Sequence, residues 1–416
     1  MEKIYLEFLR ENMIAAFGCT EPIALAYASA KASHILDGDP EKIIARCSGN
    51  IIKNTKSVIV PGTGGLKGIE ISVCLGAIAG DPDKKLEVLH GIDKKKIEQA
   101  QEMVNRGVCT VELVEGMIGL YIDIEMWDSK GNRAQVILQN SHTNITKMMK
   151  NDEILLEKEA VLEEEKEVDF SFDSIYEVAQ TCDYSSIQDV LDRQIEYNLA
   201  IAKEGLKSNW GSRIGKTIYS IAKSNKDIAI AHAAAGSDAR MSGCELPVVI
   251  NSGSGNQGIT ISLPIIIHAE KENLPKEKLY RALIFANLLG EYQKQGIGKL
   301  SAYCGVVSAG TAAVAGVAML NDEPVQVIKD TIVNGLAVTS GMICDGAKPS
   351  CAGKIAASIN TAYFGYNQAK LGYSYKDGDG VVRKDVDETI RSIGRIARYG
   401  MESTDVEILN EMIAVD

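Results

Sequence analysis

The sequence lacks both a stretch that could span a membrane and the apolar segment of a secretory signal. Its longest apolar run, Gly305–Leu320, is rich in Gly, Ala and Ser and is shorter than the roughly 20 apolar residues of a transmembrane helix. Charged residues interrupt the apolar positions of Met1–Arg10, whereas a signal peptide has a continuous hydrophobic region. We therefore expect a cytoplasmic protein without a membrane partner, whose cysteines stay reduced.

The sequence also lacks an excess of basic residues. Lys and Arg number 44 against 56 Asp and Glu, which gives a net charge of −12. A protein that binds nucleic acid non-specifically needs a basic surface, so we expect no nucleic-acid partner. With 45% hydrophobic and 24% charged residues over 416 positions, the composition is that of a globular protein with about two or three domains.

No spacing typical of a structural zinc site is present. The nine cysteines contain no C-x2-C pair, and the five histidines contain no H-x3-H or H-E-x-x-H motif. Cys304, Cys344 and Cys351 nevertheless lie beside or near Gly, Ser or Pro in turn-like segments, and loops can bring such thiols together. Three thiolates would leave one iron of a four-iron cluster open. Three unrelated buried thiols are the alternative interpretation.

A fourth cysteine lies where a helix is expected to begin. In the segment Gly18–Pro22 (GCTEP) we expect Thr20 to be the N-cap, with Pro22 in the first turn. Cys19 then lies just before the positive end of the helix dipole, a position that lowers the pKa of a thiol. Cys19 is therefore a candidate nucleophile or base. The alternative is a small buried residue at a helix entrance.

One glycine-rich loop matches the G-x-G-x-x-G pattern of dinucleotide sites. It is Gly253–Gly258, and the segment after it (ITISLPIIIH) is β-branched and interrupted by Pro264, whereas a dinucleotide site needs a helix there. A nucleotide-dependent enzyme is therefore the weakest alternative. We expect instead a loop that binds a carboxylate through its backbone N–H groups and through the side chains of Ser254, Asn256 and Gln257.

The second glycine-rich loop is Pro61–Gly65 (PGTGG). It lacks the G-K-[ST] ending of a nucleotide-binding P-loop. Gly62 and Thr63 of this loop, together with the nearby Asn54 and Lys67, are a similar candidate for binding a small anion.

The periodicity of apolar residues predicts an α+β fold. The first part mixes helices and strands, and the part after the acidic stretch 151–170 is mostly helical. We place a mixed α/β domain that carries Cys19 at 1–170 and a mostly helical domain at 171–416. The predicted helices are Met1–Phe17, Glu21–His34, Lys94–Arg106, Ile187–Glu204, Gly211–Ser224, Asp227–Ser242, Lys276–Gly290, Ser308–Leu320, Val325–Ser340 and Val386–Tyr399. The predicted strands are Lys42–Ala45, Ser57–Val60, and a hairpin of Tyr121–Trp127 with Ala134–Gln139.

Five motifs together resemble those of the L-cysteine desulfidase family, which is related to the α-chain region of the iron–sulfur L-serine dehydratases. They are GCTEPIALAYA, the SGN–PGTGG region, SGSGNQG, YCGVVSAG and GMICDGAKPSCAGK. They occur in the same order, and the resemblance covers nearly the whole chain. It implies a [4Fe–4S] cluster with Cys304, Cys344 and Cys351 as ligands and one open iron, in a helical iron–sulfur domain without pyridoxal phosphate.

The resemblance also implies a reaction. The family converts L-cysteine and water to pyruvate, ammonia and hydrogen sulfide, with Cys19 as the implied base. The substrate carboxylate would be held by Asn54 and the two glycine-rich loops. The nearest alternative is an L-serine dehydratase on the same scaffold. A non-catalytic protein with a structural metal site is the remote one.

Two further expectations complete the sequence-based hypothesis. The partners are a small amino-acid substrate and, as an assembly, a second copy of the chain in a homodimer. The remaining cysteines are interpreted as small buried residues: Cys47, Cys74, Cys109, Cys182 and Cys244.

Overall fold

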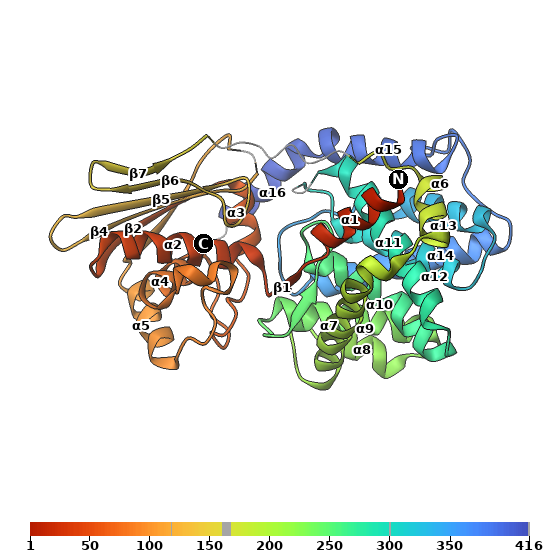
Figure 1. Ribbon diagram of the computed structural model, residues 1–416, viewed down its shortest axis with the longest axis horizontal. Helices are drawn as coiled ribbons and strands as arrows, with labels where there is room; N and C mark the ends of the chain where they lie inside the picture. Colours follow the sequence, from red (N-terminus) through yellow and green to blue (C-terminus); the bar gives the residue numbers. More distant parts are fainter. Residues whose placement is uncertain (118, 160–167, 299–300, 415–416) are drawn as a thin grey trace.

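The protein has an α+β fold with two hydrophobic cores, one between a sheet and its helices and one among helices (Figure 1). The computed structural model describes residues 1–117, 119–159, 168–298 and 301–414. Within them, no helix is long and apolar enough to cross a membrane. The cytoplasmic location and the homodimer stay predictions.

The first core lies under a six-stranded sheet of order β3-β2-β4-β5-β6-β7. Only the β2–β3 pair is parallel among these strands. The predicted hairpin is confirmed, because β4 pairs with β5 from Tyr121↔Gln139 to Trp127↔Arg133. The strands are β2 (Pro40–Cys47), β3 (Cys109–Leu113), β4 (Tyr121–Asp128), β5 (Arg133–Gln139), β6 (Ile145–Lys150) and β7 (Glu153–Glu157).

Alternate residues of the sheet face two helices. Ile122, Ile124 and Met126 of β4 are fully buried, as the period-two pattern of a strand requires. They belong to the same core as α2 (Thr20–Leu36) and α4 (Ile69–Ala79). Short elements complete this region: α3 (Gly49–Thr55), η1 (Pro82–Glu87) and α5 (Lys94–Asn105).

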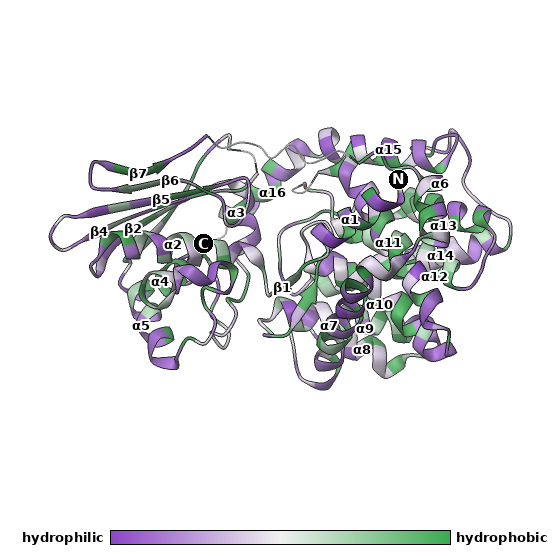
Figure 2. Cartoon of the chain, in the orientation of Figure 1, coloured by the Kyte–Doolittle hydropathy of each residue, from purple (hydrophilic) through white to green (hydrophobic). Residues whose placement is uncertain are grey.

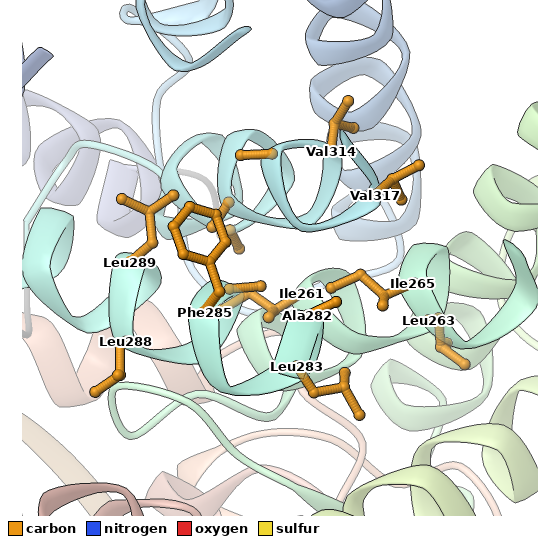
Figure 3. Close-up of a cluster of buried hydrophobic side chains, with 14 of the residues drawn as sticks. Ile261, Leu263, Ile265, Ala282, Leu283, Phe285, Leu288, Leu289, Val314 and Val317 are labelled. Atoms are coloured by element: carbon orange, nitrogen blue, oxygen red, sulfur yellow. The ribbon is translucent and has the colours of Figure 1, made fainter. Parts of the chain in front are cut away.

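The second core is helical and is centred on α10 (Gly255–Glu272), α11 (Lys276–Ile297) and α12 (Gly305–Leu320), whose apolar side chains interdigitate (Figure 3). Outer helices such as α7 carry many hydrophilic residues (Figure 2). The other elements are α6 (Phe172–Thr181), η2 (Tyr184–Ile187), α7 (Gln188–Lys207), α8 (Ile214–Ile221), α9 (Asn225–Met241), α13 (Val325–Thr339), α14 (Cys351–Lys370), α15 (Val386–Arg395) and η3 (Ile396–Gly400).

Glycines allow backbones to meet inside the helical core. A Cβ on Gly205 of α7 would lie 2.0 Å from the carbonyl oxygen of Ala235 in α9. A Cβ on Gly258 of α10 would lie 1.9 Å from the carbonyl oxygen of Val249. Side chains cannot occupy such gaps, so these contacts fix the spacing of the elements that carry the candidate site.

Both ends of the described chain cross between the two regions. Helix α1 (Glu2–Asn12) packs in the helical core, where the Tyr5 hydroxyl donates to the carbonyl of Asp169 at 2.8 Å. Helix α16 (Glu402–Ala414) returns to α3, and Leu409 packs against the sheet core. The proposed division at residue 170 stays a prediction. Part of the acidic stretch before it forms β7, and residues 160–167 lie outside the described part.

The structure corrects several sequence expectations. The segment after the G-x-G-x-x-G loop is helical, because it belongs to α10 despite Pro264. Burial along this helix outweighs a proline penalty of about 3 kcal/mol. It still forms no βαβ unit, because the preceding strand β8 (Pro247–Val249) pairs antiparallel with β1 (Ala15–Phe17).

Three local expectations were also wrong. The first helix ends at Asn12 rather than at Phe17, and the chain continues into β1. Ser57–Val60 is no strand but contributes a single bridge between Ile59 and Lys67. The N-cap of α2 is Cys19, one residue before the expected Thr20.

Candidate functional site

Two antiparallel segments bring Cys304 and Cys344 together. The backbone N–H of Cys304 donates to Met342 at 3.0 Å, and that of Cys344 donates to Ala302 at 2.6 Å. The two thiols are hydrogen-bonded to each other. Cys351, the first residue of α14, is near both thiols, and its Sγ lies 3.7 Å from the carbonyl oxygen of Gly346. The three cysteines predicted as ligands therefore gather in one place.

Buried cations surround these thiols. The hydrogen bond from Cys304 lowers the pKa of Cys344, and the Lys53 and Lys294 ammonium groups lower it further. The same hydrogen bond, together with burial, raises the pKa of Cys304. Lys53 is 2% exposed and forms an ion pair with Asp405 of α16. The two lysines therefore stabilise negative charge on a group bound among these thiols.

Backbone N–H groups also point at the sulfur atoms. Those of Val306, Gly346 and Lys348 donate to Cys304, Cys344 and Cys351 in that order. Hydrogen bonds to thiolate sulfur are a recurring feature of iron–sulfur sites. Among the described residues no three His, Cys, Asp or Glu side chains converge on a point that could hold one metal ion. A cluster makes a different demand, because each thiolate binds its own iron, so the donor set fits a cluster better than a single ion.

Cys19 lies next to this group. It is 3% exposed and packs in a small apolar cluster with Val58 and Met241, against which Cys351 is packed. The expected lowering of the Cys19 pKa at the helix entrance is wrong, because burial raises the pKa of the thiol to about 12, whereas the Arg240 guanidinium acts to lower it. The preceding Gly18 has φ +58°, a backbone conformation that glycine adopts without strain.

Arg240 connects the Cys19 loop to the Gly253–Gly258 loop. Its Nη2 donates to the carbonyl of Gly18 at 2.8 Å, and its Nη1 donates to Oδ1 of Asn256 at 3.3 Å. Its Nε is buried without a hydrogen-bond partner in the described part of the chain. A buried arginine is costly unless its charge is compensated, and this guanidinium is close enough to Cys19 for its charge to act on the thiol.

Two of the predicted carboxylate-binding residues lie near the cysteines. Asn256 donates to the sulfur of Met241 at 3.5 Å, in the apolar cluster of Cys19. The amide of Gln257 lies against Gly305, since a Cβ there would be 2.7 Å from it. The buried Oε1 of Gln257 has no hydrogen-bond partner among the described residues.

The other predicted side chains are engaged locally. Ser254 caps α10 by accepting from the N–H of Gln257. The Thr63 hydroxyl donates to the carbonyl of Val60 at 2.7 Å within its own loop. Asn54 donates to Glu21 at 3.4 Å. Asn256 is engaged as well, through Arg240 and Met241. Among these predicted side chains in the described part of the chain, only Gln257 has a buried atom without a hydrogen-bond partner.

A cavity of about 850 Å³ lies on segments that are continuous with those of the site. Gly62 of the PGTGG loop, Trp210 and Glu245 are among its lining residues. Ile59 and Ser242 also line it, and their chain neighbours Val58 and Met241 pack with Cys19. None of the four cysteines of the site lines the cavity itself. A shallower hollow of about 600 Å³, lined by His34 and Asp37, lies at the opposite end of α2 from Cys19.

The model of the serine dehydratase alpha chain matches residues 83–410 of the sequence. The chain belongs to this family. It is 45% identical over 414 residues to a UPF0597 protein of Finegoldia magna, covering 99% of each chain. It is 44% identical to a UPF0597 protein of Desulfitobacterium hafniense, covering 98% of this chain and 96% of that one. The family indicates a lyase-type, iron–sulfur enzyme.

Sequence reasoning missed the charged residues of this serine dehydratase alpha-chain family member. Lys53, Lys294 and Arg240 are single basic residues in otherwise unremarkable segments, and no motif marks them. Trp210 is one of only two tryptophans in the chain. The rarity of tryptophan is the only feature of the sequence that draws attention to Trp210, and it does not predict that this residue lines the cavity.

Proposed function

We propose that the chain is an iron–sulfur L-cysteine desulfidase that eliminates hydrogen sulfide from L-cysteine. One molecule of cysteine and one of water give pyruvate, ammonia and hydrogen sulfide, without pyridoxal phosphate. The observation that carries the proposal is the gathering of Cys304, Cys344 and Cys351 beside a fourth cysteine, Cys19.

The three gathered cysteines would hold a [4Fe–4S] cluster, with one iron left without a protein ligand. When bound, such a cluster supplies a Lewis acid that stabilises the leaving sulfur. The chain's own contribution is the surrounding charge. Lys53 and Lys294 offset the negative charge of the thiolates, and the N–H groups of the ligand loops hold the sulfur atoms in place.

Cys19 is the proposed base for the Cα proton of the substrate. Because its pKa is raised, the thiol must first release its proton to water, and the thiolate that remains is a strong base. Arg240 favours the thiolate through its charge and fixes the loop through the Gly18 carbonyl. After elimination, the aminoacrylate product tautomerises to an imine and hydrolyses without further catalytic groups.

Neutral hydrogen-bond donors are proposed to orient the substrate carboxylate. Asn256 and Gln257 lie near Cys19 and Cys304, and Gly62 lines the cavity. The further members of this proposed set are Asn54, Thr63 and Ser254. Their side chains are already hydrogen-bonded, so we expect them to act mainly by shaping their loops.

The test is turnover by protein reconstituted with iron and sulfide under anaerobic conditions. We expect sulfide and pyruvate in equal amounts from L-cysteine. An iron-loaded preparation that releases no sulfide from L-cysteine would overturn the proposal.

L-serine dehydratase activity is the second candidate, favoured by the family model that matches the chain. It would use the same residues with hydroxide as the leaving group. The same preparation decides between the two: pyruvate and ammonia from L-serine, at a higher kcat/KM than from L-cysteine, would favour the dehydratase.

A further inference from the structure

Two opposite charges line the cavity of about 850 Å³ without pairing. They are Lys67 and Glu245, and both residues are exposed. No ion pair or side-chain hydrogen bond joins them to each other or to a third group in the described part of the chain. Opposite charges that share a cavity without meeting are both available to a ligand that lies between them.

The backbone holds both residues in place. Lys67 pairs with Ile59 in an antiparallel bridge that closes the PGTGG turn. Glu245 lies against that same turn, since a Cβ on Gly62 would be only 3.2 Å from its Oε1. Gly62 has φ +76°, so glycine serves this position both by its conformation and by its lack of a side chain. The two charges are thus carried by segments that touch each other.

The pair selects one class of ligand by charge. A free α-amino acid carries a carboxylate and an ammonium on the same carbon, and these match Lys67 and Glu245. A phosphate or a dicarboxylate has only negative charge to offer and would meet the Glu245 carboxylate unfavourably. A simple cation would meet Lys67 in the same way. Only a zwitterion satisfies both charges at once.

The location joins this pair to the thiols. Ile59 and Ser242 line the cavity, and their chain neighbours Val58 and Met241 enclose Cys19. Pro349 lines a further part of the cavity, two residues before Cys351. The cavity and the cysteines are therefore built on the same short segments of the chain.

We propose that Lys67 and Glu245 recognise the carboxylate and the ammonium of a free α-amino acid at this cavity. This inference rests on the proposed function in that the amino acid is the substrate. It adds charge recognition to the neutral donors described above. Because a charged hydrogen bond contributes more than a neutral one, each residue should change affinity by about tenfold.

The test uses three small probes and two variants of the iron-loaded protein, with dissociation constants measured by anaerobic calorimetry. L-Alanine carries both charges but has no leaving group. 3-Mercaptopropionate lacks the ammonium, and cysteamine lacks the carboxylate. The variants are Lys67→Gln and Glu245→Gln, and Lys94→Gln on the exposed surface of α5 is the matched control.

We expect a crossed pattern of affinities. Lys67→Gln weakens L-alanine and 3-mercaptopropionate about tenfold and leaves cysteamine unchanged. Glu245→Gln weakens L-alanine and cysteamine about tenfold, and it leaves 3-mercaptopropionate unchanged or tighter. Lys94→Gln changes none of the three. Iron content and the circular dichroism spectrum equal to those of the parent protein show that the variants are folded.

The outcomes separate this inference from the proposed function. If both variants bind all three probes like the parent protein, or weaken all three equally, the recognition pair is overturned even when cysteine is turned over. If the crossed pattern is found but neither cysteine nor serine is consumed, the recognition pair stands and the proposed function fails.

Discussion

The chain contains two groups of three neighbouring cysteines, and they differ in what surrounds them. Cys47, Cys74 and Cys109 lie in the sheet core and are all buried, and Cys74 and Cys109 are hydrogen-bonded. In the group formed by Cys304, Cys344 and Cys351, only the first is fully buried. Proximity of thiols alone therefore does not mark a site.

The charges around the two groups differ. In the sheet core, hydrogen bonding to Cys74, burial and the Glu70 carboxylate raise the pKa of Cys109, and burial with Asp123 and Glu70 raises that of Cys47. In the other group burial raises the pKa of Cys351 as well, but Lys53 and Lys294 favour the thiolate of Cys344. A thiol must ionise to bind metal, so cationic neighbours separate a ligand set from inert core residues.

The largest expected effect comes from exchanging cysteines between the groups. Cys344→Ser or Cys351→Ser should remove most of the iron and lower turnover by roughly 100-fold or more. Cys74→Ser should keep both iron and turnover and should lower the free energy of unfolding by about 1–3 kcal/mol, because a hydroxyl is buried. Iron and sulfide analysis after anaerobic reconstitution measures the difference in iron content between these variants. Equal iron loss in Cys74→Ser would contradict the distinction between the two groups of cysteines.

Cys19 shares one property with each group of cysteines. Its pKa is raised, like the pKa values of the sheet-core cysteines Cys47 and Cys109, but it lies beside a cation, Arg240. Cys19→Ser should lower kcat by about 100-fold or more while iron content stays at the level of the parent protein, since a base is lost and no ligand is. Cys182→Ser, another buried cysteine, is the control. Loss of iron in Cys19→Ser would instead identify Cys19 as a ligand.

Without a neighbouring cation, Cys304, Cys344 and Cys351 should bind iron less well, and in this respect they should resemble the cysteines of the sheet core. Lys53→Met is expected to weaken iron retention about tenfold under a competing chelator, because a charge next to the ligands is lost. Its former partner Asp405 reaches solvent, with 25% of its side chain exposed. Lys31→Met, which breaks another Lys–Asp pair at 3.4 Å, should leave iron retention unchanged. Equal retention in both variants would contradict a role for the cation.

A pH dependence of stability does not involve either group of thiols. Burial raises the pKa of Asp238 from 3.8 to about 6, although it accepts a hydrogen bond from the N–H of Gly215 at 2.9 Å. Between pH 4 and 6 the folded chain keeps a proton that the unfolded chain releases, so stability falls as the pH rises through this window.

Comparison with the Asp238→Asn variant isolates the contribution of Asp238 to the pH dependence of stability. Relative to the variant, the parent protein should lose up to about 3 kcal/mol of its free energy of unfolding between pH 4 and pH 7. Paired thermal melts at several pH values measure it. A constant difference between the two proteins across that range would show that Asp238 does not titrate there.

Local patterns predicted much of the fold. Helices α2, α5, α9 and α13 and the β4–β5 hairpin follow from periodicity and turn residues. Helix α10 could not be found in this way, because Pro264 and β-branched residues disfavour a helix that only tertiary burial stabilises. Ser57–Val60 is apolar enough for a strand but is left with a single bridge to Lys67.

The candidate site was predictable only in part. Cys304, Cys344 and Cys351 could be grouped from motifs, and the structure brings them together. The surrounding cations could not be foreseen, because Lys53 comes from α3 in the sheet region and Lys294 comes from α11 in the helical one. Their meeting depends on long-range packing, which a single sequence does not encode in any local pattern.

The backbone contacts at Gly205 and Gly258 have a consequence for how this sequence can change over time. A bulky core residue can drift among side chains of similar volume, because its neighbours can repack. At these two positions even one added methyl group meets a carbonyl oxygen, and backbone has no alternative rotamer. We therefore expect these two small residues to tolerate fewer substitutions than the bulky residues of the same core.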